Sequence, residues 1–302
     1  MQLGFVSAIL GDMTLEEVLA FTADEGFGCV ELMCWPPGQA ERRYAGVCHL
    51  DVSEFGDEQA HRVRDLLRIH GVRISGLGYY PNPLDPDPEH RTRVVGHLRR
   101  VIRAAARLGV PVVNTFIGRD WTRSIDENWP AFRDLWPGIV RDAAAAGVRL
   151  GIENCPMLFS RDEWPGGKNL ANCPAVWRRM FAEIPDDHFG LNFDPSHLIL
   201  QHIDPARCIR EFGRRIVHVH AKDLRIDGEA LYEHGVLGLG WAVPKLPGLG
   251  DVDWGRLFAA LSETGYAGPV CIEVEDRAYE GSRADRLRAL RQSQRYLEQF
   301  VS

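Results

Sequence analysis

The sequence lacks the features of a membrane-spanning or exported protein. It contains no run of about 18 apolar residues, the length that a transmembrane helix needs, so we expect no membrane span. Its first residues, MQLGFVSAILGDM, lack the basic stretch that opens a secretory signal peptide. The seven cysteines are scattered and odd in number, which is typical of reduced thiols rather than of a disulfide framework. These absences predict a cytoplasmic protein.

Two further absences limit the metal chemistry and the partners. No two cysteines form a C-x-x-C pair, which argues against a zinc site made of thiolates. Positive charge is not in excess, because 35 lysines and arginines face 42 aspartates and glutamates, for a net charge of −7. Nucleic-acid binding requires a basic face that neutralises phosphates. We therefore expect no nucleic-acid partner.

The sequence does contain a regular alternation of apolar runs and amphipathic stretches. Runs of strand length lie at 2–7, 28–33, 72–78, 110–117, 148–153, 188–193, 216–221 and 269–274. Helical patterns lie near 14–25, 57–70, 89–108, 127–146, 174–183, 205–213, 254–264 and 284–299. Thr14 with Glu17 forms a capping-box pattern, and Asp204 before Pro205 is typical of a helix start. Eight such alternations predict an α/β protein, a single (β/α)₈ TIM barrel over residues 1–302.

Four side chains of metal-ligand type stand at or near the ends of four of these runs. They are Glu153 in LGIEN, Asp194 in GLNFDPSH, His220 in IVHVHAKD and Glu273 in VCIEVED. The carboxyl ends of the strands are where a (β/α)₈ barrel builds its active site. Oxygen and nitrogen donors without thiolates suit a divalent ion, with Mn²⁺ expected first and Mg²⁺, Co²⁺ or Zn²⁺ as alternatives.

Each of these residues also has a plain structural explanation. Glu153 could form a salt bridge to a neighbouring strand, and Asp194 could cap the turn Asp-Pro-Ser-His. His218 and His220 alternate on one face of a strand, and a lone buried histidine is more often structural. Glu273 shares its strand face with Glu275, of which only one should reach the centre. A doubly wound open sheet is the rival fold, but its ligands would have to leave four strands and still meet at one centre.

The motifs resemble those of a known family. GIEN, NFDPSH, HVHAKD, PGLGDVDWGRLFAAL and GYAGPVCIEVED are similar to segments of the sugar isomerase/epimerase family of xylose-isomerase-like TIM barrels, and the resemblance covers essentially the whole chain. It implies that Glu153, Asp194, His220 and Glu273 are the metal ligands. It also places His197 and Arg225 where ketose epimerases bind substrate, although the spacing of Arg225 from His220 differs by one residue. Lys222 matches the family's His-x-Lys-Asp segment and is implied to touch substrate oxygens.

The zinc AP endonucleases share the superfamily that this resemblance implies, and they need further histidine and aspartate ligands to hold three metals. The third strand ends in Gly78-Tyr79-Tyr80, and the fourth carries Asn114, Thr115 and Phe116, so neither supplies a histidine. We therefore expect a single metal and no cleavage of DNA.

The expected function is that of a metal-dependent sugar isomerase or epimerase. In this hypothesis Glu153 and Glu273 are the catalytic acid and base, and proton transfer passes through a metal-bound cis-enediolate. The alternative is a lyase or dehydratase that eliminates a β-leaving group from a keto-sugar, a 3-keto-glycoside or a keto-inositol. A binding module that holds metal without catalysis is a further class. The expected partner is a small sugar or keto-sugar, and a homo-oligomer would be consistent with the exposed helix faces of such barrels.

Long segments after three strands are expected to build the substrate pocket. They span 79–90, 154–172 and 223–250, and we expect each to form a loop. Few cations accompany the glycines of the last segment, which favours a substrate without phosphate. Six aromatic residues could stack on a sugar face or pack in the core: Phe5, Trp35, Tyr79, Tyr80, Phe116 and Trp121.

Overall fold

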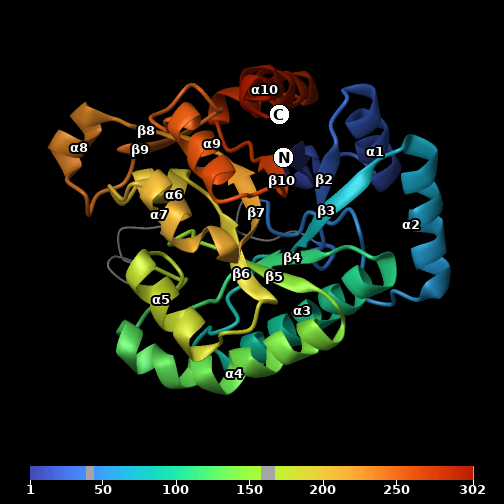
Figure 1. Cartoon of the computed structure of the whole chain (residues 1–302), viewed down its shortest axis with the longest axis horizontal. Helices are drawn as coiled ribbons and strands as arrows, with labels where there is room; N and C mark the ends of the chain where they lie inside the picture. The colour runs from blue at the N-terminus through green and yellow to red at the C-terminus, as the bar shows by residue number, and fades with distance from the viewer. Residues whose placement is uncertain (39–43, 158–166, 302) are drawn as a thin grey trace.

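The computed structural model describes residues 1–38, 44–157 and 167–301. Eight parallel strands close into a barrel in the order β1-β10-β7-β6-β5-β4-β3-β2 (Figure 1). The strands are β1 Gln2–Val6, β2 Cys29–Met33, β3 Arg73–Gly78, β4 Val112–Thr115, β5 Arg149–Glu153, β6 Phe189–Phe193, β7 Ile216–Ala221 and β10 Pro269–Ile272. The predicted closed (β/α)₈ barrel is confirmed, and the open sheet is excluded because β1 pairs with both β2 and β10.

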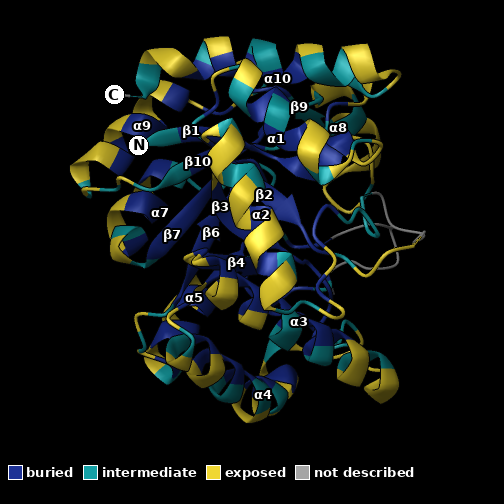
Figure 2. Cartoon of the chain, turned by 90° about the vertical axis from the view of Figure 1, so that its right-hand side faces the viewer, coloured by how far each residue is buried: buried dark blue, intermediate teal, exposed yellow. Residues whose placement is uncertain are grey.

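Helices cover the outside of this barrel. They are α1 Leu15–Asp24, α2 Asp57–His70, α3 Pro88–Leu108, α4 Ile125–Ala145, α5 Pro174–Glu183, α7 Pro205–Phe212, α9 Trp254–Glu263 and α10 Arg283–Leu297. Each shows a buried face toward the strands and an exposed face toward solvent (Figure 2). The capping box of Thr14 with Glu17 is present, and the Asp204 side chain caps α7 as predicted. None of the helices in the described ranges has the length and hydrophobicity needed to cross a lipid bilayer.

The strands are buried on both faces, which explains why their sequences are apolar almost without interruption. Large rings fill the layer between strands and helices, including Trp129, Trp136, Trp177, Phe132 and Phe189. Against this background an ionisable side chain within a strand is conspicuous, because burial of an unpaired charge is costly.

The predicted loop 223–250 is wrong in part, because it folds into regular structure. β8 (Asp223–Ile226) pairs antiparallel with β9 (Ala242–Lys245). The segment that connects these two strands contains α8 (Gly228–His234), which lies at the left edge of Figure 1. The buried Asp223 carboxylate holds the base of this hairpin, since it accepts hydrogen bonds from the backbone of Leu224, Gly248 and Val252 and from Trp254 Nε1. A short helix, α6 (Ser196–Ile199), also follows β6.

Candidate metal centre

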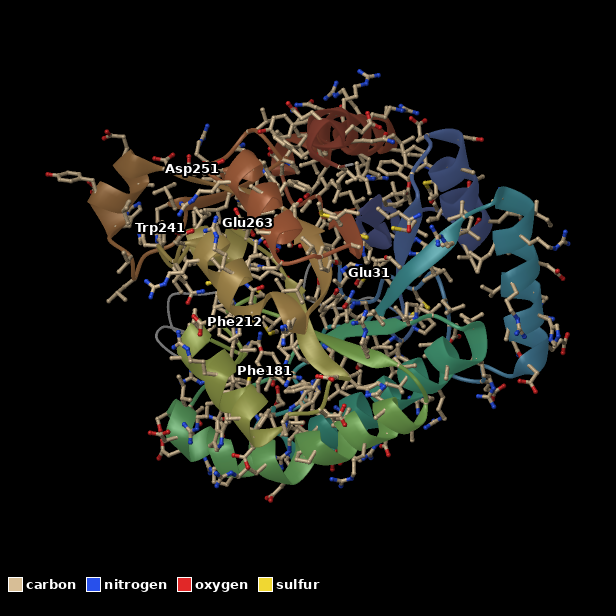
Figure 3. The ribbon with its side chains drawn as sticks, in the orientation of Figure 1. Glu31, Phe181, Phe212, Trp241, Asp251 and Glu263 are labelled. Carbon is tan, nitrogen blue, oxygen red and sulfur yellow. The ribbon has the colours of Figure 1, made fainter. Side chains whose placement is uncertain are left out.

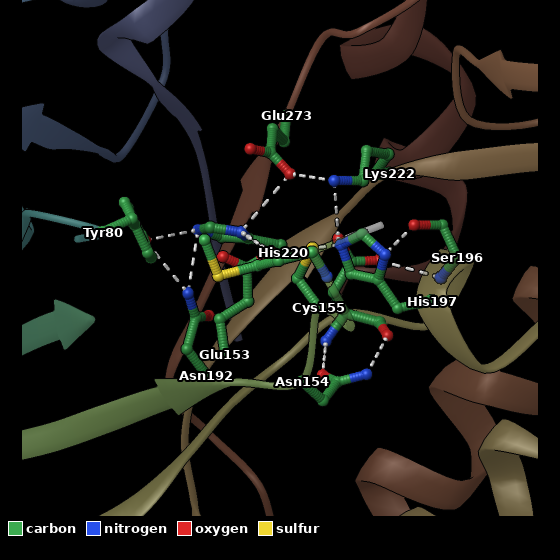
Figure 4. A network of polar contacts seen from close by, with 12 residues as sticks. Tyr80, Glu153, Asn154, Cys155, Asn192, Ser196, His197, His220, Lys222 and Glu273 are labelled. Carbon is green, nitrogen blue, oxygen red and sulfur yellow. Dashed lines mark hydrogen bonds and ion pairs between the residues drawn. The ribbon is translucent and has the colours of Figure 1, made fainter. Parts of the chain in front are cut away.

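The four predicted ligands come from adjacent strands of the barrel. Glu153 ends β5, Asp194 follows β6, His220 lies in β7, and Glu273 follows β10. Because β5, β6, β7 and β10 are neighbours in the barrel, their carboxyl ends meet at one place. One ligand atom from each residue lies within 4.8 Å of the corresponding atoms of the other three. Figure 4 shows the side chains of Glu153, His220 and Glu273 in this cluster. His220 Nδ1 lies 3.8 Å from Glu153 Oε1 and 3.5 Å from Glu273 Oε2.

Two atoms in this cluster are buried and make no hydrogen bond: Asp194 Oδ2 and His220 Nδ1. The other oxygen of Asp194 is held in place, because Oδ1 accepts hydrogen bonds from the backbone and hydroxyl of Ser196. Oδ2 is thereby directed toward the cluster, where Lys222 Nζ lies 3.1 Å away. Buried polar atoms that lack a hydrogen bond are rare in folded proteins and call for an explanation. Three carboxylates and one imidazole with such atoms fit a divalent cation.

Two carboxylates of the cluster, those of Glu153 and Glu273, are held in their ionised form. Burial alone would raise the pKa of Glu153, but the hydrogen bond from His197 and the adjacent His220 outweigh it and lower the pKa to about 2. Burial would likewise raise the pKa of Glu273, whereas the charges of Lys222 and His220 hold it well below its ordinary value. Both groups are therefore anionic near neutral pH, as metal ligands must be.

Behind His220 lies an acidic residue that the sequence analysis missed. His220 Nε2 donates to Glu31 Oε2 at 2.8 Å, and the Tyr80 hydroxyl donates to the other oxygen of Glu31. Figure 3 shows Glu31 near the centre of the barrel, and its side chain is fully buried. Burial alone would lower the pKa of His220, but the surrounding carboxylates outweigh it and raise this pKa, so the ring is protonated in the metal-free chain. With one proton held on Nε2, Nδ1 is the nitrogen that would lose its proton and offer its lone pair to a bound cation. A carboxylate that fixes the tautomer of a histidine in this way supports metal binding. The available signal was a single acidic residue inside the apolar run CVELM.

Glu31 also approaches His218, so Glu31, His218 and His220 form a second group close enough to share an ion. Burial lowers the pKa of His218 to about 4, which leaves this ring neutral. Its Nδ1 faces Asn192 Oδ1 at 3.0 Å, and its Nε2 faces the Ser75 hydroxyl at 3.2 Å. Because both ring nitrogens already have hydrogen-bond partners, we interpret this group as a support for the first one.

Two asparagines tie the ligand-bearing segments together, and the sequence analysis missed both. Asn154 donates to the backbone carbonyl of Asp194 and accepts from its N–H, each at 2.8 Å, so the ends of β5 and β6 are fixed to each other. Asn169 donates to the carbonyls of Glu153 and Cys155 and accepts from the N–H groups of Ile117 and Gly118. The only signal for Asn154 was its place in GIEN, and Asn169 gave none.

Of the three residues predicted to bind substrate, two lie at the metal cluster and one does not. His197 Nε2 lies 3.2 Å from Glu153 Oε1 and 3.3 Å from Asp194 Oδ2, and Lys222 Nζ lies 2.7 Å from Glu273 Oε2. Lys222 therefore pairs with the cluster rather than with Asp223. Arg225, in contrast, lies in β8 with an exposed side chain, and it is not brought to the cluster.

A model of the xylose isomerase-like TIM barrel family matches residues 19–300. The chain belongs to this family.

Relatives of this xylose isomerase-like barrel include proteins with and without an assigned activity. This chain is 27% identical to the uncharacterized protein YfiH of Bacillus subtilis (strain 168) over 316 residues, which cover 91% of this chain and 93% of YfiH. It is 28% identical to the inosose dehydratase of Lacticaseibacillus casei over 159 residues, which cover 51% and 52% of the two chains.

Solved structures share the fold at low sequence identity. The IOLI protein with a bound zinc atom superposes with a TM-score of 0.73 at 16% identity, covering 100% of both chains. The 3-keto-D-glucoside 4-epimerase YcjR from E. coli superposes with a TM-score of 0.70 at 19% identity, covering 99% of both chains. At these identities the likeness shows the fold alone.

In this xylose isomerase-like barrel the cluster opens into a cavity of about 1680 Å³. Glu153, His197, Lys222 and Glu273 line it, together with four of the aromatic residues singled out in the sequence: Trp35, Tyr79, Tyr80 and Phe116. Phe5 instead packs in the core against Phe21 and Phe27. Trp121 lies under Lys168 Nζ, 4.6 Å from its ring centroid, and is not among the described lining residues. Residues 158–166 of the predicted loop 154–172 lie outside the described ranges.

Proposed function

We propose that this chain is a divalent-metal-dependent enzyme that moves a proton on the carbon beside the carbonyl group of a sugar or keto-sugar, as an isomerase or epimerase. The observation that carries the proposal is the convergence of Glu153, Asp194, His220 and Glu273 at the mouth of the barrel, with buried acceptor atoms that make no hydrogen bond. We further propose that these four residues are the metal ligands, and that Glu31 fixes the orientation of His220.

A bound divalent cation would supply Lewis-acid polarisation of the substrate carbonyl, which acidifies the neighbouring C–H group. Glu153 and Glu273 are the two carboxylates placed to exchange that proton, because both are anionic and both line the cavity. One of them removes the proton. The other returns a proton either to the same carbon, which gives epimerisation, or to the former carbonyl carbon, which gives isomerisation.

His197 and Lys222 are the remaining polar groups at this end of the cavity. Lys222 is a buried cation beside Asp194, Glu273 and Glu275, and its ammonium can donate to a substrate oxygen that enters the cluster. His197 contacts Glu153 directly and can hold that carboxylate in position while it donates to substrate. Both residues would stabilise the negative charge that develops on oxygen during proton removal.

A dehydratase is the second candidate, and two observations favour it. The chain is similar over about half its length to an inosose dehydratase. Lys222 is also a buried proton donor that could protonate a departing hydroxyl group. In this reaction the carboxylate again removes the proton beside the carbonyl. The electron pair then expels the β-hydroxyl as water and leaves an enone.

The two candidates share their first step and differ in product. The test is to incubate the protein with Mn²⁺ in D₂O and to add free ketoses, keto-inositols and 3-keto-glucosides in separate reactions. Mass spectrometry and NMR then report deuterium gain, rearrangement and loss of water. We expect deuterium in at least one substrate, with conserved mass otherwise for an epimerase and loss of water for a dehydratase. Absence of both deuterium gain and water loss from every substrate, with metal shown to be bound, would reject both candidates.

The metal itself is a further part of the proposal. The ligand set suits Mn²⁺, Mg²⁺, Co²⁺ and Zn²⁺, and we propose Mn²⁺ as the ion of the active enzyme. Calorimetric titration of chelator-treated protein with each ion, followed by the exchange assay, ranks them. Activity that is highest with another of the four ions would correct the identity of the metal but not the site.

A further inference from the structure

The cavity is larger than a single sugar ring requires. Ligand sites that enclose a drug-sized molecule have volumes of about 300–1,000 Å³. The cavity of this protein measures about 1680 Å³ and is continuous with the metal centre, since Glu153, His197, Lys222 and Glu273 are among its lining residues. A monosaccharide held at the metal centre would therefore leave much of the space unfilled.

The part of the cavity formed by the β8–α8–β9 hairpin is apolar. Six large hydrophobic side chains are exposed in the described part of the chain, and three of them, Val236, Leu237 and Leu239, line this one cavity. They belong to the segment VLGLGW at 236–241, which contains no polar or charged side chain apart from the indole N–H of Trp241. Leu200, after α6, lines the cavity as well. We call these five residues the apolar wall: Leu200, Val236, Leu237, Leu239 and Trp241.

The apolar wall is held in shape by hydrogen bonds within the hairpin. Trp241 Nε1 donates to the Gly238 carbonyl at 3.0 Å, Gly238 N–H donates to Gly235, and Asp227 N–H donates to the Trp241 carbonyl. The Trp241 ring is only 5% exposed and lies parallel to the His202 ring, with 6.4 Å between their centroids. Figure 3 shows Trp241 between the α8 excursion and the segment that follows β6. The exposed Leu237 and Leu239 thus belong to an ordered segment that lines the same cavity as the metal centre.

We propose that the substrate carries an apolar substituent, an aromatic or alkyl aglycone, that packs on the apolar wall while its sugar ring occupies the metal centre. The proposal rests on the proposed function and names its substrate class as hydrophobic keto-glycosides rather than free sugars. Exposed apolar side chains that gather at one cavity are typical of a ligand site. The metal centre holds the polar ring through charged groups, and the apolar wall offers the complementary surface for the aglycone.

The test separates binding from turnover. Phenyl and methyl β-D-glucoside are titrated calorimetrically into the Mn²⁺-loaded protein, and the corresponding 3-keto-glucosides are compared in the D₂O exchange assay. Because contacts in a hydrophobic pocket discriminate by about 10–200-fold, we expect at least a tenfold preference for the phenyl compound in both measurements. Tighter phenyl binding, with no exchange in these 3-keto-glucosides or in any other keto-sugar of the panel, would support the apolar wall and reject the proposed function. Equal binding of the two glucosides, or no binding of either, would overturn the inference whatever the exchange assay shows.

A matched pair of variants assigns the preference to the wall. Leu239 and Leu249 are each 43% exposed, but only Leu239 lines the cavity among the described residues. We expect Leu239→Ser, and more strongly Leu237→Ser combined with it, to reduce the phenyl-to-methyl ratio, whereas Leu249→Ser should retain it. A dimer that the Leu239→Ser variant dissociates, with an unchanged phenyl-to-methyl ratio, would show that a second copy of the chain covers the wall and would overturn the inference.

Discussion

The metal centre and the apolar wall lie at two ends of one cavity, and each holds side chains in an environment that is unusual for them. At the metal centre, ionisable groups such as Asp194 and His220 are fully buried, whereas at the apolar wall Val236, Leu237 and Leu239 are about half exposed. Burial of charge and exposure of large apolar side chains both cost free energy in the isolated chain. In our proposal each cost would be offset by a ligand, a cation at one end and an apolar group at the other. The comparison therefore indicates a ligand with two chemically different halves.

The largest expected effect comes from the charged end. Glu153→Gln and Glu273→Gln each remove one proton-transfer group, so we expect solvent-deuterium exchange to fall by about 10²–10⁴-fold in each variant. Glu58→Gln, on the exposed face of α2, is the control, because within the described ranges Glu58 pairs with Arg62 alone, on the surface. Exchange at the wild-type rate in both active-site variants would remove these carboxylates from the mechanism.

A second substitution tests the metal centre without removing any of the proposed ligands. Glu31→Gln weakens the acceptor that fixes the His220 ring, so we expect affinity for Mn²⁺ to fall about 10–100-fold. Calorimetric titration of the metal-free protein measures this effect. Tyr80→Phe keeps the carboxylate and loses only one hydrogen bond to it, so its effect should be smaller. Unchanged affinity in Glu31→Gln would mean that His220 does not need this partner.

Acid should destabilise the metal-free protein through the same groups. The pKa of Glu153 is about 2 in the folded chain and 4.5 ordinarily, so between these values the unfolded chain binds a proton that the folded chain does not. The contribution of Glu153 to stability is therefore complete above pH 4.5 and is lost as the pH falls toward about 2. Urea unfolding at a series of pH values should show a shallower acid decline for Glu153→Gln than for the wild type. Parallel declines would contradict this assignment.

The smallest expected effect is that of a substitution at Arg225, which lies outside the metal centre, and it is compared with one at His197. His197→Ala removes a contact to Glu153 and a group that lines the cavity, so kcat/KM should fall clearly. Arg225 is exposed on β8, so Arg225→Ala should retain kcat/KM close to that of the wild type. Steady-state kinetics on the substrate found in the exchange assay decides the matter. A larger loss for Arg225→Ala than for His197→Ala would show that β8 reaches the substrate.

The sequence was sufficient for the barrel and for the convergence of four side chains, for a simple physical reason. Strands buried on both faces are apolar throughout, so an acidic residue or histidine at a strand end stands out, and the closed topology brings those ends together. Glu31 was harder to recognise, because one acidic residue within a strand resembles a salt-bridge partner and its histidine is 189 residues away.

The β8–β9 hairpin and the supporting asparagines could not be predicted from sequence patterns. β8 and β9 have four residues each and are separated by a Gly-rich segment, so their periodicity is too short to distinguish from a loop. Asn169 acts through hydrogen bonds from a loop to two strand ends, and no local pattern announces such contacts. Arg225 lies exposed on β8, which pairs with β9 in the hairpin, and the spacing from His220 could not reveal this hairpin.

The most direct test of the central claim is a crystal structure of the protein soaked with Mn²⁺, with the ion located by its anomalous scattering. We expect one ion bound by Glu153, Asp194, His220 Nδ1 and Glu273, with His220 Nε2 still hydrogen-bonded to Glu31. An ion bound elsewhere, or bound at this place without at least three of these four residues, would contradict this claim.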